Sequence, residues 1–124
     1  FDIAHMGRIH FTGTDAVAFL DSIVTNDVAA LAVGQIRYAL VTNESGGILD
    51  DVLVYRLDDA YMLVVNASNR VKILDWIKQH QAGFDVKVID RTESNFMFAL
   101  QGPRSIEILN QLVDSCDVGE LGYY

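Results

Sequence analysis

The sequence predicts an α+β fold in which a mostly antiparallel sheet carries its helices on one side. Short apolar stretches with period-two alternation indicate the strands, and stretches whose apolar residues recur at intervals of three and four indicate the helices. Turns rich in Gly, Asn and Asp join neighbouring strands directly, as in antiparallel sheets. The expected order along the chain is β-α-β-β-β-α-β-β-α.

The amino-terminal part of the chain predicts a strand followed by a helix. Ile9 and Phe11 share one face of the strand expected at 8–12. Thr14 or Asp15 is expected to cap the helix, because a side-chain oxygen there can accept a free backbone N–H. The apolar stripe of this helix is Val17, Phe19, Leu20, Ile23 and Val24.

Two hairpins are expected in the middle of the chain. A turn at 43–47, rich in Asn, Ser and Gly, joins a strand at 36–42 to a strand at 48–57. A tight turn made of two aspartates then leads to a returning strand at 60–67. The hairpins place three consecutive strands side by side.

The rest of the chain predicts a second helix, two strands and a last helix. Ser68 or Asn69 is expected to cap the second helix, which stops at Gly83. Strands are expected at 84–89 and 96–100, the second of them buried. The inward residues of the second helix are expected to be Val71, Ile73, Leu74, Trp76 and Ile77. The last helix opens at Gly102-Pro103 and has Ile106, Leu109 and Leu112 on one stripe.

Asp50 and Asp51 are adjacent carboxylates inside an apolar strand. Because side chains alternate, Asp51 shares its face with leucines and Tyr55, and Asp50 points to the other face. With a two-residue turn at 58–59, Asn66 lies opposite Asp51 on that face. A carboxylate among Leu and Tyr is costly to bury unless something pairs with it, so this face predicts a planar ligand with several N–H groups. The alternative is a solvated pair that merely ends the turn.

Composition bounds the class of protein. With 124 residues, 51% of them hydrophobic, the chain suffices for one domain or a piece of one. A net charge of −8 and a pI near 4.5 argue against a nucleic-acid or membrane partner. The single Cys116 fits a reducing compartment and is interpreted as a small buried residue. The start at Phe1 and the uncapped tail at 118–124 suggest a fragment of a longer chain.

The remaining candidates favour structural roles. His5 and His10 are expected to be satisfied structural histidines, because their spacing suits no common metal site. His80 is expected to cap a helix or face water. Neighbouring side chains on a strand diverge, so a divalent metal at the Asp50–Asp51 pair is not expected.

Several strings, taken in order, resemble the glycine cleavage T protein family, the aminomethyltransferases. The strings are FDIAHMG at 1–7, TND at 25–27, NESGGILDDVLVYRL at 43–57, VVNASNR at 64–70, GFDVKV at 83–88 and ALQGP at 99–103. The resemblance covers only the inner part of the amino-terminal, folate-binding half of such a protein. It implies tetrahydrofolate as cosubstrate, bound in a central cavity shared by three domains.

The resemblance also implies the reaction and its site. The family moves a one-carbon unit from the aminomethyl-lipoyl arm of the H protein to N5 and N10 of the folate and releases ammonia, in the bacterial cytoplasm or the mitochondrial matrix. Asp51 matches the family's catalytic carboxylate, and the folate pocket matches Met6, Tyr38, Tyr55 and Asn66. Asn66 could hydrogen-bond the pterin edge in either sense. Further pocket residues are expected beyond Tyr124, so the fragment alone is expected to be inactive.

A second hypothesis keeps the same pocket for another purpose. The chain could be the folate-binding domain of a dimethylglycine or sarcosine oxidising enzyme, or of a folate-dependent regulatory protein. An intact Asp51 favours catalysis, because a pure binding module needs no poised carboxylate at that position.

Overall fold

A five-stranded antiparallel sheet with the strand order β2-β3-β4-β1-β5 forms the centre of the fold. It is seen in a computed structural model that describes residues 1–114 and 117–123. The strands are β1 (Gly7–Thr12), β2 (Ile36–Thr42), β3 (Ile48–Arg56), β4 (Tyr61–Val65) and β5 (Lys87–Asp90). The helices are α1 (Ala16–Ile23), α2 (Arg70–His80) and α3 (Ser105–Asn110), with short 3₁₀ turns η1 (Ala67–Asn69) and η2 (Val118–Glu120). The predicted α+β class is confirmed. The expected burial of Cys116 concerns a residue that lies outside the described part of the chain.

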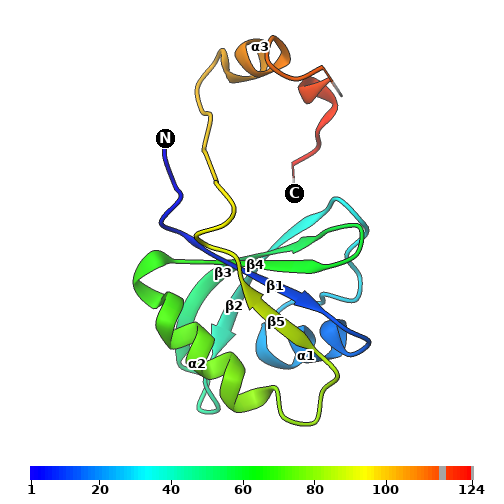
Figure 1. The fold of residues 1–124 in the computed structure, drawn as a ribbon, viewed down its shortest axis with the longest axis vertical. Helices are drawn as coiled ribbons and strands as arrows, with labels where there is room; N and C mark the ends of the chain where they lie inside the picture. Colours follow the sequence, from blue (N-terminus) through cyan, green and yellow to red (C-terminus); the bar gives the residue numbers. More distant parts are fainter. Residues whose placement is uncertain (115–116, 124) are drawn as a thin grey trace.

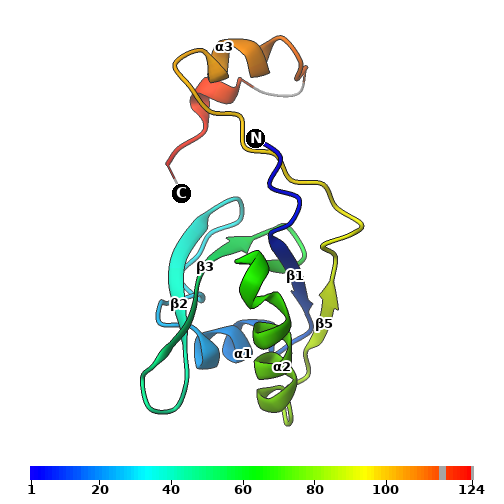
Figure 2. The same cartoon turned by 90° about the vertical axis from the view of Figure 1, so that its left-hand side faces the viewer.

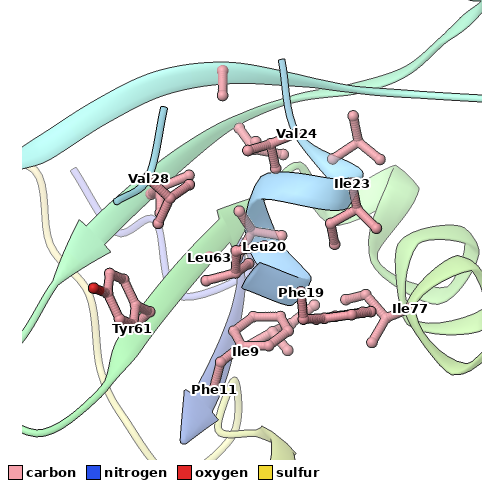
Figure 3. Packing of buried hydrophobic residues seen from close by; sticks show 14 of the residues in the cluster. Ile9, Phe11, Phe19, Leu20, Ile23, Val24, Val28, Tyr61, Leu63 and Ile77 are labelled. Carbon is pink, nitrogen blue, oxygen red and sulfur yellow. The ribbon is translucent and has the colours of Figure 1, made fainter. Parts of the chain in front are cut away.

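Helices α1 and α2 cover the same face of the sheet (Figures 1 and 2). The core between them is apolar and fully buried: Phe19 and Leu20 of α1 pack on Ile9 and Phe11 of β1, and Ile77 comes from α2 (Figure 3). Burial of such side chains contributes about 1.5–3 kcal/mol each. Since the helices occupy one face only, the other face of the sheet is left for a site.

Both predicted hairpins are confirmed. In the first turn, Asn43 Oδ1 accepts the backbone N–H of Ser45 and of Gly47 at 3.1 and 2.7 Å, and Gly46 adopts a positive φ of 82°. The β3–β4 register pairs Leu53 with Val64, as the two-residue turn requires.

The carboxy-terminal segment does not follow the prediction. Residues 96–100 form no sheet strand, and Phe96 and Phe98 are 78% and 71% exposed. This segment instead runs beside the amino terminus, where Asp2 and Phe98 form an isolated bridge (Figure 1). The expected buried strand is therefore wrong, because its partner is a terminal segment lying outside the sheet.

Some residues of two predicted apolar stripes are exposed. Helix α3 stands away from the sheet, so Ile106 and Leu112 of its predicted stripe are 52% and 76% exposed (Figure 2). On α2, Val71 is 70% exposed, whereas Ile73 and Ile77 are buried. Val71 precedes Ile73 by two residues, which at 3.6 residues per turn places it about 200° around the helix, so it faces away from the core.

The expected capping residues have other partners. Asp15 precedes α1, but its carboxylate accepts the Asp85 backbone N–H at 2.8 Å and caps no helical N–H. Asn69 precedes α2 and donates its amide to Asp50 Oδ1 at 2.5 Å. Side chains that the local sequence predicts as helix caps form hydrogen bonds with residues distant in the sequence instead.

Within the described residues, none of the helices combines the length and the apolar character that a membrane span requires.

Candidate functional site

A hollow of about 220 Å³ lies on the sheet face that the helices leave open. Strand alternation places Tyr38 of β2 and Asp51 of β3 on this face, because Ala39 and Val52 point into the core. The lining residues are Met6, Tyr38, Asp51, Val52, Leu53, Val64 and Asn66. Four of the five residues predicted for the site thus lie around one hollow.

The strand register brings Tyr38 close to Asp51. Asp51 pairs with Leu40, and Tyr38 pairs with Leu53, so Tyr38 and Asp51 are diagonal neighbours on adjacent strands. The Tyr38 hydroxyl lies 3.5 Å from Asp51 Oδ2, at the outer limit of a hydrogen bond. The ring is half exposed and gives the hollow a flat wall.

Asn66 follows β4 and holds the other oxygen of Asp51. Its side-chain nitrogen donates to Asp51 Oδ1 at 2.8 Å and to the Asp51 carbonyl at 3.0 Å. The predicted opposition of Asp51 and Asn66 is therefore confirmed. The amide N–H on one oxygen orients the carboxylate within the hollow.

The buried carboxylate is Asp50, not Asp51, which corrects the expectation from the sequence. Asp50 lies on the core face of β3 and is 2% exposed, whereas Asp51 is exposed. Its charge is compensated by hydrogen bonds from the backbone N–H of Asn66 at 2.9 Å, from the Asn66 amide at 2.9 Å and from the Asn69 amide at 2.5 Å. The alternative of a solvated Asp50–Asp51 pair is therefore wrong for Asp50, which is buried.

Arg8 is a buried residue that the sequence analysis did not identify. The residue is 1% exposed, and its guanidinium donates to the carbonyls of Met6 at 2.8 Å, Ala4 at 2.9 Å and Thr92. These bonds hold the segment that carries Met6 into the hollow. No signal in the sequence indicated that Arg8 is buried, because strand alternation points it away from the apolar face of Ile9 and Phe11.

The Asp90 carboxylate supports this arrangement from β5. It accepts the Thr92 hydroxyl and backbone N–H, and it forms an ion pair with Arg70 at 2.6 Å. Burial opposes ionisation of Asp90, but the bonds from Thr92 and the bond and charge of Arg70 outweigh it and lower the pKa below its ordinary value. Asp90 is thereby kept ionised and holds Thr92, the partner of Arg8.

The TND string at 25–27 fixes the strand that carries Tyr38. The Thr25 hydroxyl accepts the Leu40 backbone N–H at 3.0 Å, and the Asn26 amide donates to the Tyr38 carbonyl at 3.0 Å. β2 is one of the two edge strands of the sheet, so these side chains satisfy backbone groups that no further strand covers.

The whole chain, residues 1–124, matches the family described as the GCVT N-terminal domain. The chain belongs to this family. The resemblance seen in its sequence strings is thereby confirmed.

Relatives of the GCVT N-terminal domain found by sequence are named aminomethyltransferases. The chain is 41% identical over its full length to the aminomethyltransferase of Clostridium botulinum (strain Okra / Type B1), of which it covers 34%. It is also 41% identical to that of Thermotoga maritima, again over its full length and 34% of the relative. The chain thus spans about a third of the length of the curated relatives it matches.

A solved structure has the same fold. The glycine cleavage system aminomethyltransferase T from Bartonella henselae superimposes with a TM-score of 0.89 at 36% identity. The match covers 99% of this chain and 33% of that one. The GCVT N-terminal domain described here therefore corresponds to part of a longer protein.

Tyr55 is the predicted site residue that the structure does not place around the hollow. It lies further along β3, where it pairs with Ile36 on one side and Met62 on the other. Its side chain is half buried on the same sheet face as Asp51. Its contact with a ligand stays a prediction.

The histidines of this GCVT N-terminal domain lie outside the hollow. His10 Nε2 is buried without a hydrogen-bond partner, so the expectation of a satisfied His10 is wrong for that atom. His80 Nδ1 lies 2.8 Å from the Trp76 carbonyl at the end of α2, as expected of a capping residue. Among residues 1–114 and 117–123, His, Cys, Asp and Glu form no group of three that could hold a metal ion.

The site's chemistry follows from its groups. A carboxylate held by an amide can accept a proton from a nitrogen nucleophile or orient it. A tyrosine ring and a methionine beside it suit a flat, mostly apolar ligand body. The GCVT N-terminal domain therefore presents a carboxylate beside an aromatic wall in one hollow.

Proposed function

We propose that the protein containing this domain is a tetrahydrofolate-dependent aminomethyltransferase of the glycine cleavage system. It takes a one-carbon unit from the aminomethyl-lipoyl arm of the H protein and passes it to tetrahydrofolate. The single observation that carries the proposal is Asp51, held by Asn66 inside the hollow that Met6 and Tyr38 line. The aminomethyltransferase names of the relatives support the choice of reaction.

In the proposed reaction the one-carbon unit becomes a methylene bridge between N5 and N10 of the folate. The carbon loses its bonds to the amine and to the lipoyl sulfur, and each folate nitrogen gives up one proton. The amine leaves as ammonia and the sulfur as a thiol, so these two protons balance the products. Asp51 is proposed to orient a folate nitrogen and accept its proton, because its carboxylate lines the hollow and can take up a proton.

The binding residues have separate proposed roles. Tyr38 and Tyr55 give flat walls for the pterin, and Met6 supplies an adaptable apolar contact. Asn66 contacts a polar edge of the ring and holds Asp51 in place. The proposed compartment is the one that contains the H protein, the cytoplasm of a bacterium or the mitochondrial matrix.

The test compares the full-length protein with its Asp51→Asn variant. The substitution keeps the shape and removes the charge, so tetrahydrofolate affinity should change less than about threefold while kcat falls by about 100-fold or more. Asp58→Asn, in the exposed turn after β3, is the matched control and should match wild type in both measurements. Unchanged turnover in Asp51→Asn would refute the proposed role of Asp51.

The fragment itself gives a second test. Residues 1–124 span about a third of the relatives, and we propose that the rest of the pocket lies outside them. The chain alone should turn over aminomethyl-H protein and tetrahydrofolate at less than about a hundredth of the full-length rate, because the missing residues bind and orient the reactants. A rate comparable with that of the full-length protein would contradict this.

A further inference from the structure

We propose that Asp50 is a positioning residue that fixes the orientation of the Asn66 amide. Asp50 accepts a hydrogen bond from the Asn66 side-chain nitrogen and so keeps this nitrogen turned toward the two aspartates. Asn66 then offers its carbonyl oxygen to the ligand and keeps Asp51 in place. This inference rests on the proposed function, because the ligand it refers to is the folate. It predicts that the site selects an N–H donor at this point of the ring.

The hydrogen bonds of Asn66 carry the first step. Its Nδ2 donates to Asp50 Oδ1 at 2.9 Å, to Asp51 Oδ1 at 2.8 Å and to the Asp51 carbonyl at 3.0 Å. Ionised carboxylates and carbonyl groups only accept hydrogen bonds. A flipped amide would place the Asn66 oxygen against these acceptors and lose all of the bonds. The nitrogen therefore faces both aspartates, although their side chains project from opposite faces of β3.

Burial makes Asp50 the stronger constraint of the two. Asp50 is 2% exposed and Asp51 is exposed, so water can replace a bond to Asp51 but not a bond to Asp50. The ion pairs formed within residues 1–114 and 117–123 involve Asp90, Glu44 and Glu107, and none includes Asp50. Among the described residues, its hydrogen-bond donors are N–H groups of Asn66 and Asn69. The buried Asp50 carboxylate therefore requires that the Asn66 amide points its NH₂ group, not its oxygen, toward it.

The consequence for the ligand concerns Asn66 Oδ1. Asn66 lines the hollow, and its N–H groups are directed to the aspartates. The group left for a ligand is the carbonyl oxygen, an acceptor. The sequence alone allowed either orientation, whereas the structure allows the acceptor only. A reduced pterin carries ring N–H groups that such an acceptor can bind.

A double-mutant cycle in the full-length protein tests the inference. The variants are Asp50→Asn, Asn66→Ala and the pair, with tetrahydrofolate Kd, KM, kcat and melting temperature measured for each. The amide introduced by Asp50→Asn could donate to Asn66 Oδ1 and so allow the flipped orientation; we expect Kd and KM to rise about tenfold, with a smaller change in kcat. In the Asn66→Ala background, Asp50→Asn should add less than about a twofold change in Kd. Asp58→Asn is the matched control.

The outcomes are distinguishable. Wild-type affinity in Asp50→Asn, or losses in Kd that simply add in the double variant, would overturn the inference, because Asp50 would then not act through Asn66. Additive losses are also what a general structural role would give. Failure of wild type to bind tetrahydrofolate would instead overturn the proposed function.

A measurement on the wild-type protein covers the case in which Asp50→Asn does not fold. NMR hydrogen exchange of side-chain amides compares Asn66 with Asn43, whose Oδ1 accepts hydrogen bonds in an exposed turn. We expect the Asn66 Nδ2 protons to exchange at least about tenfold more slowly than those of Asn43, before any ligand is added. Equal or faster exchange at Asn66 would overturn the inference.

Discussion

The hydroxyl of Tyr38 lies 3.5 Å from Asp51 Oδ2, across the β2–β3 pair, which is too long for a strong hydrogen bond. Tyr38 therefore contributes mainly its ring to the hollow. Tyr38→Phe should change kcat and KM of the full-length protein by less than about threefold, because the weak bond is worth less than about 0.5 kcal/mol. Tyr38→Ala removes the wall and should raise KM for tetrahydrofolate by about tenfold. A tenfold loss of kcat in Tyr38→Phe would show that the hydroxyl takes part in the reaction.

The buried guanidinium of Arg8 ties Ala4, Met6 and Thr92 together. Arg8→Met leaves these carbonyls without their donor, so the free energy of unfolding should fall by about 2–4 kcal/mol in urea titrations. Arg8→Lys should recover less than half of the loss, since an ammonium lacks the planar fork. The exposed Lys72 provides the control, and Lys72→Met should stay within about 0.5 kcal/mol of wild type. Equal stability of Arg8→Met and wild type would show that the hydrogen bonds of the Arg8 guanidinium do not stabilise the fold.

Thr25 protects the free edge of β2. Thr25→Val keeps the side-chain shape and removes the acceptor of the Leu40 N–H, so the free energy of unfolding should fall by about 1 kcal/mol. Hydrogen exchange should locate the effect: the Leu40 amide loses protection, and the amide of Val54 in the neighbouring strand keeps its own. Uniform loss of protection at both amides would indicate a global effect and contradict the proposed local role.

His10 makes stability depend on pH. Burial is the main reason why its pKa lies below 6.5; the nearby Arg91 charge lowers the pKa further, and Asp59 opposes both. The unfolded chain takes up a proton near pH 6.5 while folded His10 stays neutral, so the contribution is full above that pH and is lost as the pH falls below it. Urea titrations of wild type and His10→Gln between pH 7 and about 5 should give a smaller loss of stability in the variant. A larger loss in His10→Gln would reverse the sign and contradict this.

The places where sequence reasoning failed share a physical cause. Phe96 and Phe98 alternate as a buried strand would, yet this segment pairs with the amino terminus outside the sheet and both side chains are exposed. Asp15 and Asn69 have the chemistry of helix caps, yet distant groups, Asp85 and Asp50, bind them more directly. Local patterns state what a side chain can do, whereas the partner is chosen by contacts remote in sequence.

The sequence by itself determined the hairpins and the β3–β4 register, and with them the opposition of Asp51 and Asn66. Strand alternation and a two-residue turn leave a single register, since a slip by one residue would turn every core residue of β3 to the open face. Only the tertiary structure decided that Asp50 is the buried carboxylate and that the Asn66 nitrogen faces both aspartates. That outcome depends on donors 16 and 19 residues along the chain, brought to Asp50 when β4 and α2 pack against β3.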